Sequence, residues 1–167
     1  MATYSMQTNR QIIRKRNIEE DSWQHVADDG ELPGGDVIVS LARFRDERAA
    51  LLSREGRTGV RIPNDVVAAE LAGELEGVDL VAIDFPIYRD GRAFSIARIL
   101  RRKGFDGELR AVGNVLRDQL FFMERCGFDT YELEDGKSLE NALEAFREFG
   151  VTYQDAIEPR SAPRSDA

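Results

Sequence analysis

Short apolar, strand-like runs alternate with amphipathic, helix-like segments along most of this chain, and this alternation is what most restricts its fold. The clearest run is Leu80-Val81-Ala82-Ile83, which is continuous and apolar, as expected for a strand whose sheet is covered on both faces. Strands and helices alternating at this spacing predict βαβ units joined by right-handed crossovers. The predicted fold is therefore α/β, with a mainly parallel sheet of five to six strands flanked by helices.

Two arrangements of that sheet fit the pattern. One is an open, doubly wound sheet, which we favour, and the other is a half-barrel-like (βα) repeat. Apolar periodicity and turn residues predict the following elements: strands at 36–41, 58–62, 78–85, 108–112 and 129–133, a further strand at 151–153, and helices at 45–55, 64–77, 95–103, 116–126 and 138–149.

The chain divides into one main domain and two terminal segments. Its 167 residues, 42% of them hydrophobic, suffice to bury a single core. Residues 1–35 are expected to form an N-terminal β-hairpin and a linker, with strands at 11–16 and 22–26 on either side of a turn. Residues 36–156 form the predicted α/β domain. Residues 157–167 mix proline, serine, alanine and charges, which is typical of a disordered tail.

Composition excludes several classes of protein. No apolar run approaches the roughly 18 residues of a membrane-spanning helix, and the N-terminus lacks the apolar core of a signal peptide. A single cysteine, Cys126, cannot form a disulfide within the chain or complete an iron–sulfur cluster or a cysteine-rich zinc site. We therefore expect a cytoplasmic protein with no membrane attachment, no metal and no cofactor.

The net charge of −8 argues against nucleic-acid binding, which needs a basic surface. Residues 86–125 nevertheless carry nine Arg/Lys against five Asp/Glu. On the predicted helix 95–103, the apolar residues share one face and the basic residues the other. The candidates for docking an acidic partner are Arg98, Arg101, Arg102 and Lys103.

Polar residues gather where the strongest predicted strand ends. In parallel sheets, ligands bind beyond the carboxyl ends of strands, where the next helix offers backbone N–H groups. Arg89 and Arg92 could donate to an oxyanion, and Ser95 could cap the following helix. Asp84 and Asp90 could form a carboxylate pair for acid–base or magnesium chemistry. The alternative is an Asp-Gly turn followed by a capped helix, with both carboxylates capped or ion-paired.

A second polar group follows the predicted strand at 108–112. Arg117 and Asp118 could face the same pocket, together with Arg110 and Asn114. This group lacks the spacing of a nucleotide-binding P-loop and of a dinucleotide-binding turn. A local ion-pair network is the alternative. The anion-binding candidates are Arg89, Arg92, Ser95, Arg110, Asn114 and Arg117, and the acid/base candidates are Asp84, Asp90 and Asp118.

Three other features favour structural roles. Cys126 ends a predicted helix, where the helix dipole disfavours a thiolate, so a core residue is expected rather than a nucleophile. His25, the only histidine, lies in the predicted hairpin, outside the α/β domain that a catalytic triad would need. Phe121 and Phe122 belong to an apolar stripe that is more typical of core than of a partner surface.

Several blocks resemble the bacterial DUF934 family. They are Phe85 through Arg92, Ser95-Ile96-Ala97-Arg98, Gly107 through Gly113, Val115 through Leu120, and Cys126-Gly127-Phe128-Asp129. The resemblance covers residues 23–133. It implies a place beside sulfite reductase and the other proteins of assimilatory sulfate reduction. Similar proteins often carry Asp where this chain has Asn114, and they are sometimes labelled oxidoreductases, although no dinucleotide, cluster or flavin motif supports that label here.

Two functions follow as hypotheses. The first is a cytosolic accessory or adaptor protein of sulfur assimilation, which acts with sulfite reductase or with an acidic electron carrier such as ferredoxin. The second is a small-molecule enzyme or anion-binding module that uses an Arg/Asp-lined pocket at the strand ends. A scaffold with purely structural polar loops is a third possibility.

Overall fold

The computed structural model describes residues 10–86 and 91–157, with side chains up to residue 148. The candidates Arg89 and Asp90 lie outside the described residues, as do residues 158–167 of the expected disordered tail. Within the described part, no helix combines the length and the apolar character needed to cross a membrane.

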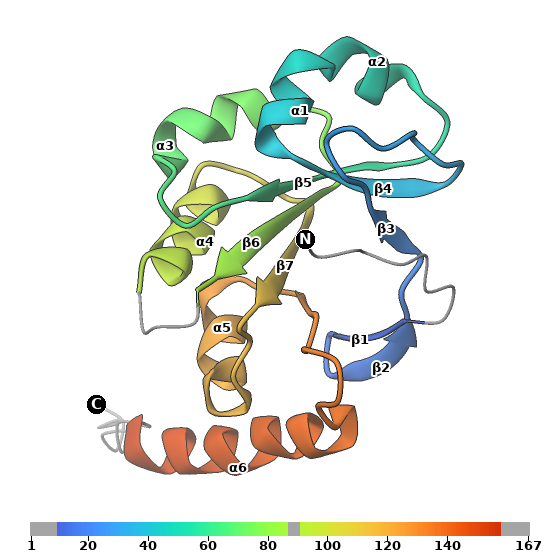
Figure 1. Cartoon of the computed structure of the whole chain (residues 1–167). Helices are drawn as coiled ribbons and strands as arrows, with labels where there is room; N and C mark the ends of the chain where they lie inside the picture. The colour runs from blue at the N-terminus through green and yellow to red at the C-terminus, as the bar shows by residue number, and fades with distance from the viewer. Residues whose placement is uncertain (1–9, 87–90, 158–167) are drawn as a thin grey trace, which may run out of the picture.

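The described strands form one curled sheet in the order β2-β1-β8-β7-β6-β5-β4-β3 (Figure 1). Strands β3 to β8 are parallel to one another, and β1 pairs antiparallel with β8 and β2. The strands are β1 (Gln11–Arg14), β2 (Asn17–Glu20), β3 (Trp23–His25), β4 (Asp36–Ser40), β5 (Thr58–Ile62), β6 (Leu80–Phe85), β7 (Glu108–Gly113) and β8 (Thr130–Tyr131). The α/β class, the mainly parallel sheet and the N-terminal hairpin are confirmed, and of the two arrangements considered the half-barrel is the one observed.

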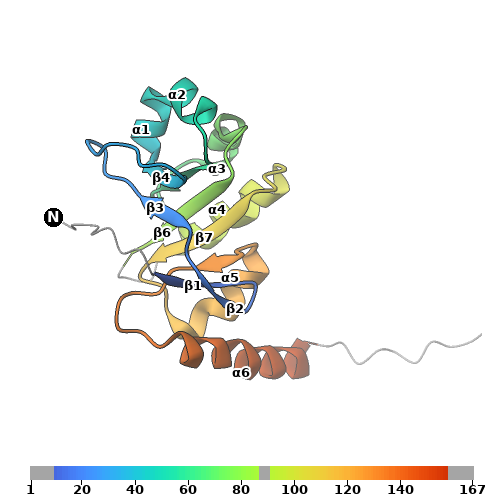
Figure 2. The same cartoon turned by 90° about the vertical axis from the view of Figure 1, so that its right-hand side faces the viewer.

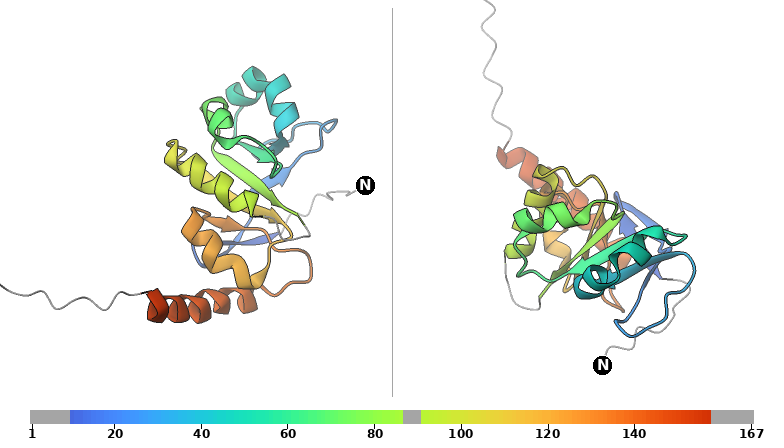
Figure 3. Two further views of the ribbon diagram at one scale, coloured as in Figure 1. Left: turned by 90° about the vertical axis from the view of Figure 1, so that its left-hand side faces the viewer. Right: turned by 90° about the horizontal axis from the view of Figure 1, so that it is seen from above.

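The helices lie along the convex face of the sheet, with α1 and α2 at one end and α6 at the other (Figures 2 and 3). They are α1 (Leu41–Asp46), α2 (Arg48–Ser53), α3 (Ala68–Leu71), η1 (Ala72–Leu75), α4 (Arg92–Arg102), η2 (Arg117–Gln119), α5 (Leu120–Cys126) and α6 (Leu139–Ile157). A doubly wound sheet would have helices on both faces. Here the concave face has to be filled in another way.

The core follows the two-residue alternation of the strands. Residues such as Val39, Val60, Val81 and Leu109 point to the helices and belong to the main apolar cluster. Their neighbours point to the concave face, where a second and much smaller cluster forms from Trp23, Ile38, Leu80, Ala82 and Val112. The concave face is therefore only partly apolar.

The N-terminal hairpin exists, but its predicted pairing is wrong. Residues 17–21, expected as the turn, instead supply the second strand. The turn is Lys15-Arg16, with φ of 47° and 65°, as in the two-residue turns that match strand twist. Residues 23–25 form β3 at the opposite edge of the sheet, parallel to β4. The usual sequence signal for such a turn, a glycine, is missing at these two positions.

Other boundaries also differ. The predicted helix at 45–55 is two short helices, the first of them capped by Ser40, whose Oγ accepts from Arg43 N at 3.1 Å. Helix α4 begins at Arg92, so Ser95 lies inside the first turn and is not an N-cap. The predicted strand at 151–153 is wrong, because these residues continue α6.

Candidate functional site

The concave face is filled in its middle by a buried ion network rather than by apolar residues. The side chain of Arg110 on β7 has 0% of its surface exposed. Its Nη1 donates to Asp21 Oδ2 at 2.9 Å and to Glu132 Oε1 at 2.7 Å. Glu132, 4% exposed, also lies 2.7 Å from His25 Nε2. The network thus joins β7, the residue after β8, and β3 from the far edge of the sheet.

The charges of this network hold one another ionised. Burial alone would raise the pKa of Glu132, but the hydrogen bond with His25 and the positive charges of Arg110 and Arg10 lower it to about 2. Burial likewise opposes the charge of Arg110, but Glu132 and Asp21 outweigh it, and the pKa of Arg110 is raised. Glu132 and Arg110 are therefore both charged at neutral pH and are not groups ready to exchange protons.

Acid should weaken the fold through Glu132. A carboxyl group whose pKa is lower in the folded state stabilises the fold above its unfolded pKa, near 4.5, and loses that contribution as the pH falls towards about 2. Glu132→Gln lacks this titration. In urea unfolding at a series of pH values, we expect the difference in free energy of unfolding between wild type and Glu132→Gln to narrow as the pH falls below 4.5. A difference that stays constant over this range would contradict the assignment. Glu134→Gln, exposed two residues away, is the control and should leave the pH profile unchanged.

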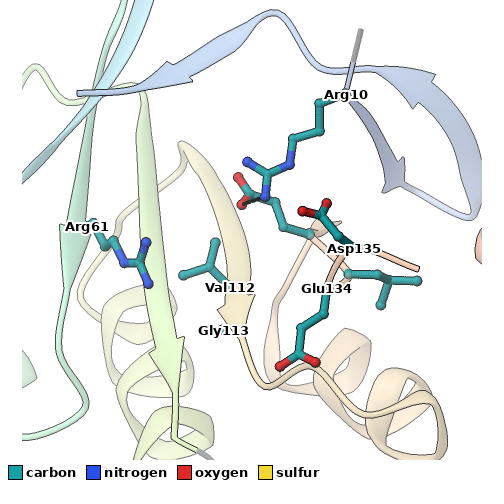
Figure 4. Close-up of a pocket in the computed structure, with 8 residues that line it drawn as sticks. Arg10, Arg61, Val112, Gly113, Glu134 and Asp135 are labelled. Atoms are coloured by element: carbon teal, nitrogen blue, oxygen red, sulfur yellow. Dashed lines mark ion pairs between the residues drawn. The ribbon is translucent and has the colours of Figure 1, made fainter. Parts of the chain in front are cut away.

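Beyond the ion network, a cavity of about 250 Å³ opens at the carboxyl ends of the strands. It is lined by Arg10, Arg61, Val112, Gly113, Glu132, Leu133, Glu134 and Asp135 (Figure 4). This is the edge at which parallel α/β sheets bind ligands. We call this cavity the mouth of the half-barrel.

Carboxylates hold both arginines of the mouth in place. Arg61 on β5 donates from Nε to Asp84 Oδ2 at 3.0 Å and from Nη2 to the other oxygen of the same carboxylate. Arg10 contacts Glu132, with 3.3 Å between Nη2 and Oε2. Figure 4 shows Arg61 on one side of Val112, with Arg10, Glu134 and Asp135 on the other. The mouth therefore presents oriented guanidinium groups together with the exposed carboxylates of Glu134 and Asp135.

Gly113 is needed where β7 ends. Its φ is +85°, and a Cβ there would lie 2.6 Å from the carbonyl oxygen of Phe85. Asn114 N donates to that same oxygen at 2.9 Å, which ties the end of β7 to the end of β6. A side chain at residue 113 would push these two strand ends apart and distort the floor of the mouth.

The predicted site residues do not converge on one pocket. Asp84 reaches the mouth as the partner of Arg61, and Arg110 lies in the buried network. Arg92 and Ser95 are exposed at the start of α4, and Asp118 is exposed in η2. Arg117 does not line the mouth, and its guanidinium donates to Asn141 O and to Glu148 on α6. Residues that follow a strand end were taken to face the ligand edge, whereas these belong to helices on the convex face.

Sequence reasoning missed most of the mouth, namely Arg10, Arg61, Glu132, Glu134 and Asp135. It also left His25 outside the α/β domain, although His25 packs against Glu132 within the same sheet. A signal was present. In three strand-like segments, one charged residue stands between two apolar residues, and these charged residues are Arg61, Arg110 and Glu132. Because alternate residues of a strand point to opposite faces, this pattern indicates a sheet face that no helix covers.

The predicted docking residues separate into two groups. Arg98, Arg102 and Lys103 are exposed. Arg101 is only 27% exposed, and its guanidinium donates to the carbonyl oxygens of Phe105, Gly107 and Gly127 and to Asp129. Arg101 therefore holds the fold together, and Arg98, Arg102 and Lys103 are the docking candidates whose side chains are exposed.

The described residues contain no group of three or more His, Cys, Asp or Glu side chains arranged to hold a metal ion. Cys126 is buried, and burial raises the pKa of its thiol although Arg98 and Arg125 oppose this. The thiol is therefore protonated at neutral pH, as is typical of a cysteine in a core.

Comparison with known families identifies the chain. The model of the family described as a bacterial protein of unknown function, DUF934, matches residues 59–163. The chain belongs to the DUF934 family. The match confirms the resemblance found in the sequence, although it begins at β5 rather than at residue 23. This DUF934 protein has no match among the curated proteins or the solved structures.

The matched region of the DUF934 chain contains most of the mouth. Seven of its eight lining residues fall within 59–163, and only Arg10 precedes the match. The match also includes α4 and α5 but excludes β1 to β4. The mouth and the convex surface over α4 and α5 thus both belong mainly to the part that the family model describes.

Proposed function

We propose that this DUF934 protein is an accessory protein of assimilatory sulfur metabolism that binds sulfite reductase or its acidic electron donor. The binding site in this proposal is the α4–α5 surface, defined as Arg98, Arg102, Lys103, Phe122 and Arg125. All five side chains are exposed. The pathway in the proposal rests on the association of the resembling family with sulfite reductase, and the site rests on the charge and shape of this surface.

The observation that carries the proposal is the one-sided charge of α4. The helix contains four arginines and no acidic residue, and Lys103 follows it directly. On α5, the carboxylate of Glu124 is already paired with Arg16 of the hairpin, with 2.7 Å between Oε1 and Nη2. On a chain of net charge −8, this basic surface would attract and orient an acidic partner.

Phe122 gives the same surface an apolar centre. It is 44% exposed, and its ring lies 4.9 Å from that of Phe94 and 5.4 Å from the guanidinium carbon of Arg98. Exposed aromatic residues held beside arginines are typical of the residues that dominate binding energy at protein interfaces. Charge would bring the partner to this surface, and burial of Phe122 would retain it.

The proposal is tested with purified components and a matched pair of variants. Arg102→Glu/Lys103→Glu reverses two exposed charges on the α4–α5 surface. Lys137→Glu/Arg147→Glu makes the same chemical change at exposed positions outside it. We expect the first variant to weaken binding to purified sulfite reductase or ferredoxin by about tenfold or more, because charge pairs across an interface contribute at least about 1.4 kcal/mol together. The second should bind as wild type does.

Binding is measured by biolayer interferometry at low and at high ionic strength, with a thermal melt of each variant. Wild-type affinity should fall as salt rises, since the attraction between exposed charges is screened. The proposal is wrong if neither purified partner binds the wild-type chain, or if the two double variants bind equally well.

A further inference from the structure

The mouth carries charges of both signs around an apolar floor, which is a different arrangement from the α4–α5 surface. Arg61 lies on one side of Val112, and the acidic side chains of Glu134 and Asp135 lie on the other (Figure 4). Leu133, which is buried, adds apolar surface beside them. A ligand that fills this cavity meets donors, acceptors and an apolar contact within one small space.

The buried network explains why these charges keep their positions. Glu132 lines the mouth and is fixed from behind by His25 and Arg110, at 2.7 Å each. Glu132 in turn orients Arg10, whose side chain is 31% exposed. Because the network is buried and its charges compensate one another, Arg10 is held at the mouth by a rigid support rather than by solvent-exposed contacts.

The arginines supply the recognition of a carboxylate. A guanidinium has five N–H donors, and a carboxylate bound along one edge uses two of them. In the described residues, Arg10 contacts Glu132 through Nη2. Its planar fork suits a second, incoming carboxylate. Arg61 adds positive charge from the opposite wall.

The acidic side chains supply the complementary half. With Glu132 paired to Arg10 and Asp84 paired to Arg61, the carboxylates of Glu134 and Asp135 leave the mouth with an excess of negative charge. A purely anionic ligand would be repelled by them. A ligand with an ammonium group beside its carboxylate would pair with these carboxylates and with the guanidinium groups.

We propose that the mouth of the half-barrel binds a small zwitterion of the α-amino acid type. Its carboxylate contacts Arg10, and Arg61 adds positive charge from the opposite wall. Its ammonium group contacts Glu134 and Asp135, and its side chain rests on Val112 and Leu133. The cavity of about 250 Å³ lies below the usual range for drug-sized ligands, which fits a single amino acid. This site is independent of partner docking, because it lies at the strand ends and not on α4 and α5.

The test uses the whole chain and isothermal titration calorimetry with a panel of common L-amino acids. The tightest binder is then compared with its matched amine and its matched acid. For leucine these are 3-methylbutylamine and 4-methylpentanoate. We expect an amino acid to bind and both matched compounds to bind at least about tenfold more weakly, because each leaves one set of the mouth's charges unpaired.

Two variants of mouth residues test whether the amino acid binds in this cavity. Glu134→Gln/Asp135→Asn removes the two exposed carboxylates, and Arg10→Gln removes the exposed guanidinium. Either change should weaken binding of that amino acid about tenfold or more, whereas Glu55→Gln/Glu70→Gln, which neutralises two exposed acids elsewhere, should not change it. Glu134 and Asp135 are exposed, so their variant should melt as wild type does.

Three outcomes overturn the proposal. No amino acid binds at millimolar concentration, or the matched acid or amine alone binds as tightly as the amino acid, or the Glu134→Gln/Asp135→Asn variant binds as tightly as wild type. None of these results bears on sulfite reductase or ferredoxin, since no partner protein is present in the titration.

Discussion

Replacing Arg110 with methionine is expected to lower the free energy of unfolding by about 3–5 kcal/mol. The guanidinium is completely buried and contacts the carboxylates of Asp21, Glu108 and Glu132. Methionine has a similar length but no charge, so the substitution leaves these carboxylates in the interior without their main counter-ion. The cost is that of uncompensated buried charge rather than of lost packing.

Urea unfolding followed by circular dichroism measures this effect. Arg14→Met is the matched control, since Arg14 lies on β1 of the same sheet and pairs with Glu108 and Glu19 but is 43% exposed. An exposed ion pair contributes about 0–1 kcal/mol, so the control should lose little. If the two variants lose the same stability, the network does not support the fold in the way described.

The partners of Arg110 provide a second check. Adding Asp21→Asn and Glu132→Gln to Arg110→Met removes the unpaired charges, and the triple variant should be more stable than the sum of the three separate losses predicts. Within the described residues, Arg110 Nε has no hydrogen-bond partner, so the native network leaves one buried donor unsatisfied. A neutral network can therefore recover part of the lost stability.

Arg101→Ala is expected to cost about 2–3 kcal/mol, whereas Arg102→Ala should change stability by less than about 0.5 kcal/mol. Arg101 donates to Gly127 O at 3.1 and 3.0 Å and to Asp129 Oδ2 at 2.6 Å. It also donates to the carbonyl oxygens of Phe105 and Gly107, at 2.9 and 2.7 Å. One side chain thus ties the end of α4 to the end of α5 and to the segments that lead into β7 and β8.

Thermal and urea unfolding of the two alanine variants decides between a supporting and a docking role for Arg101. Equal stability of both would mean that these hydrogen bonds add nothing to the fold. The distinction matters for partner binding, because a charge reversal at Arg101 would weaken binding simply by unfolding the chain. Arg102 and Lys103 are the better positions for that experiment.

The strands in the middle of the sheet could be predicted closely from local pattern. Strand β5 lies at the predicted residues 58–62, and β6 and β7 differ by two residues at most. Their apolar runs are continuous or alternate cleanly, so a short window of sequence contains the information. Local pattern alone was sufficient there.

The edges of the sheet could not be predicted in the same way. The pairing of β1 with β8 and of β3 with β4 depends on contacts between separate parts of the chain. The periodicity of a short sequence window contains no information about such contacts. The mouth was missed for a related reason. Arg10 meets Glu132 because β1 pairs with β8, and His25 meets Glu132 because the sheet curls. A sheet with helices on both faces would have no concave face on which these polar residues could gather.

The path of the chain through the sheet also governs the order of events during synthesis. Strands β1 and β3 are made early, but β1 pairs with β8, and His25 contacts Glu132, which lies 107 residues further along the chain. At ordinary translation rates this delay is on the order of ten seconds. During that time His25 lacks Glu132, and β1 can pair with β2 but lacks its second sheet neighbour, β8. Refolding from denaturant, in which both ends are present from the start, therefore follows a different sequence of steps from folding on the ribosome.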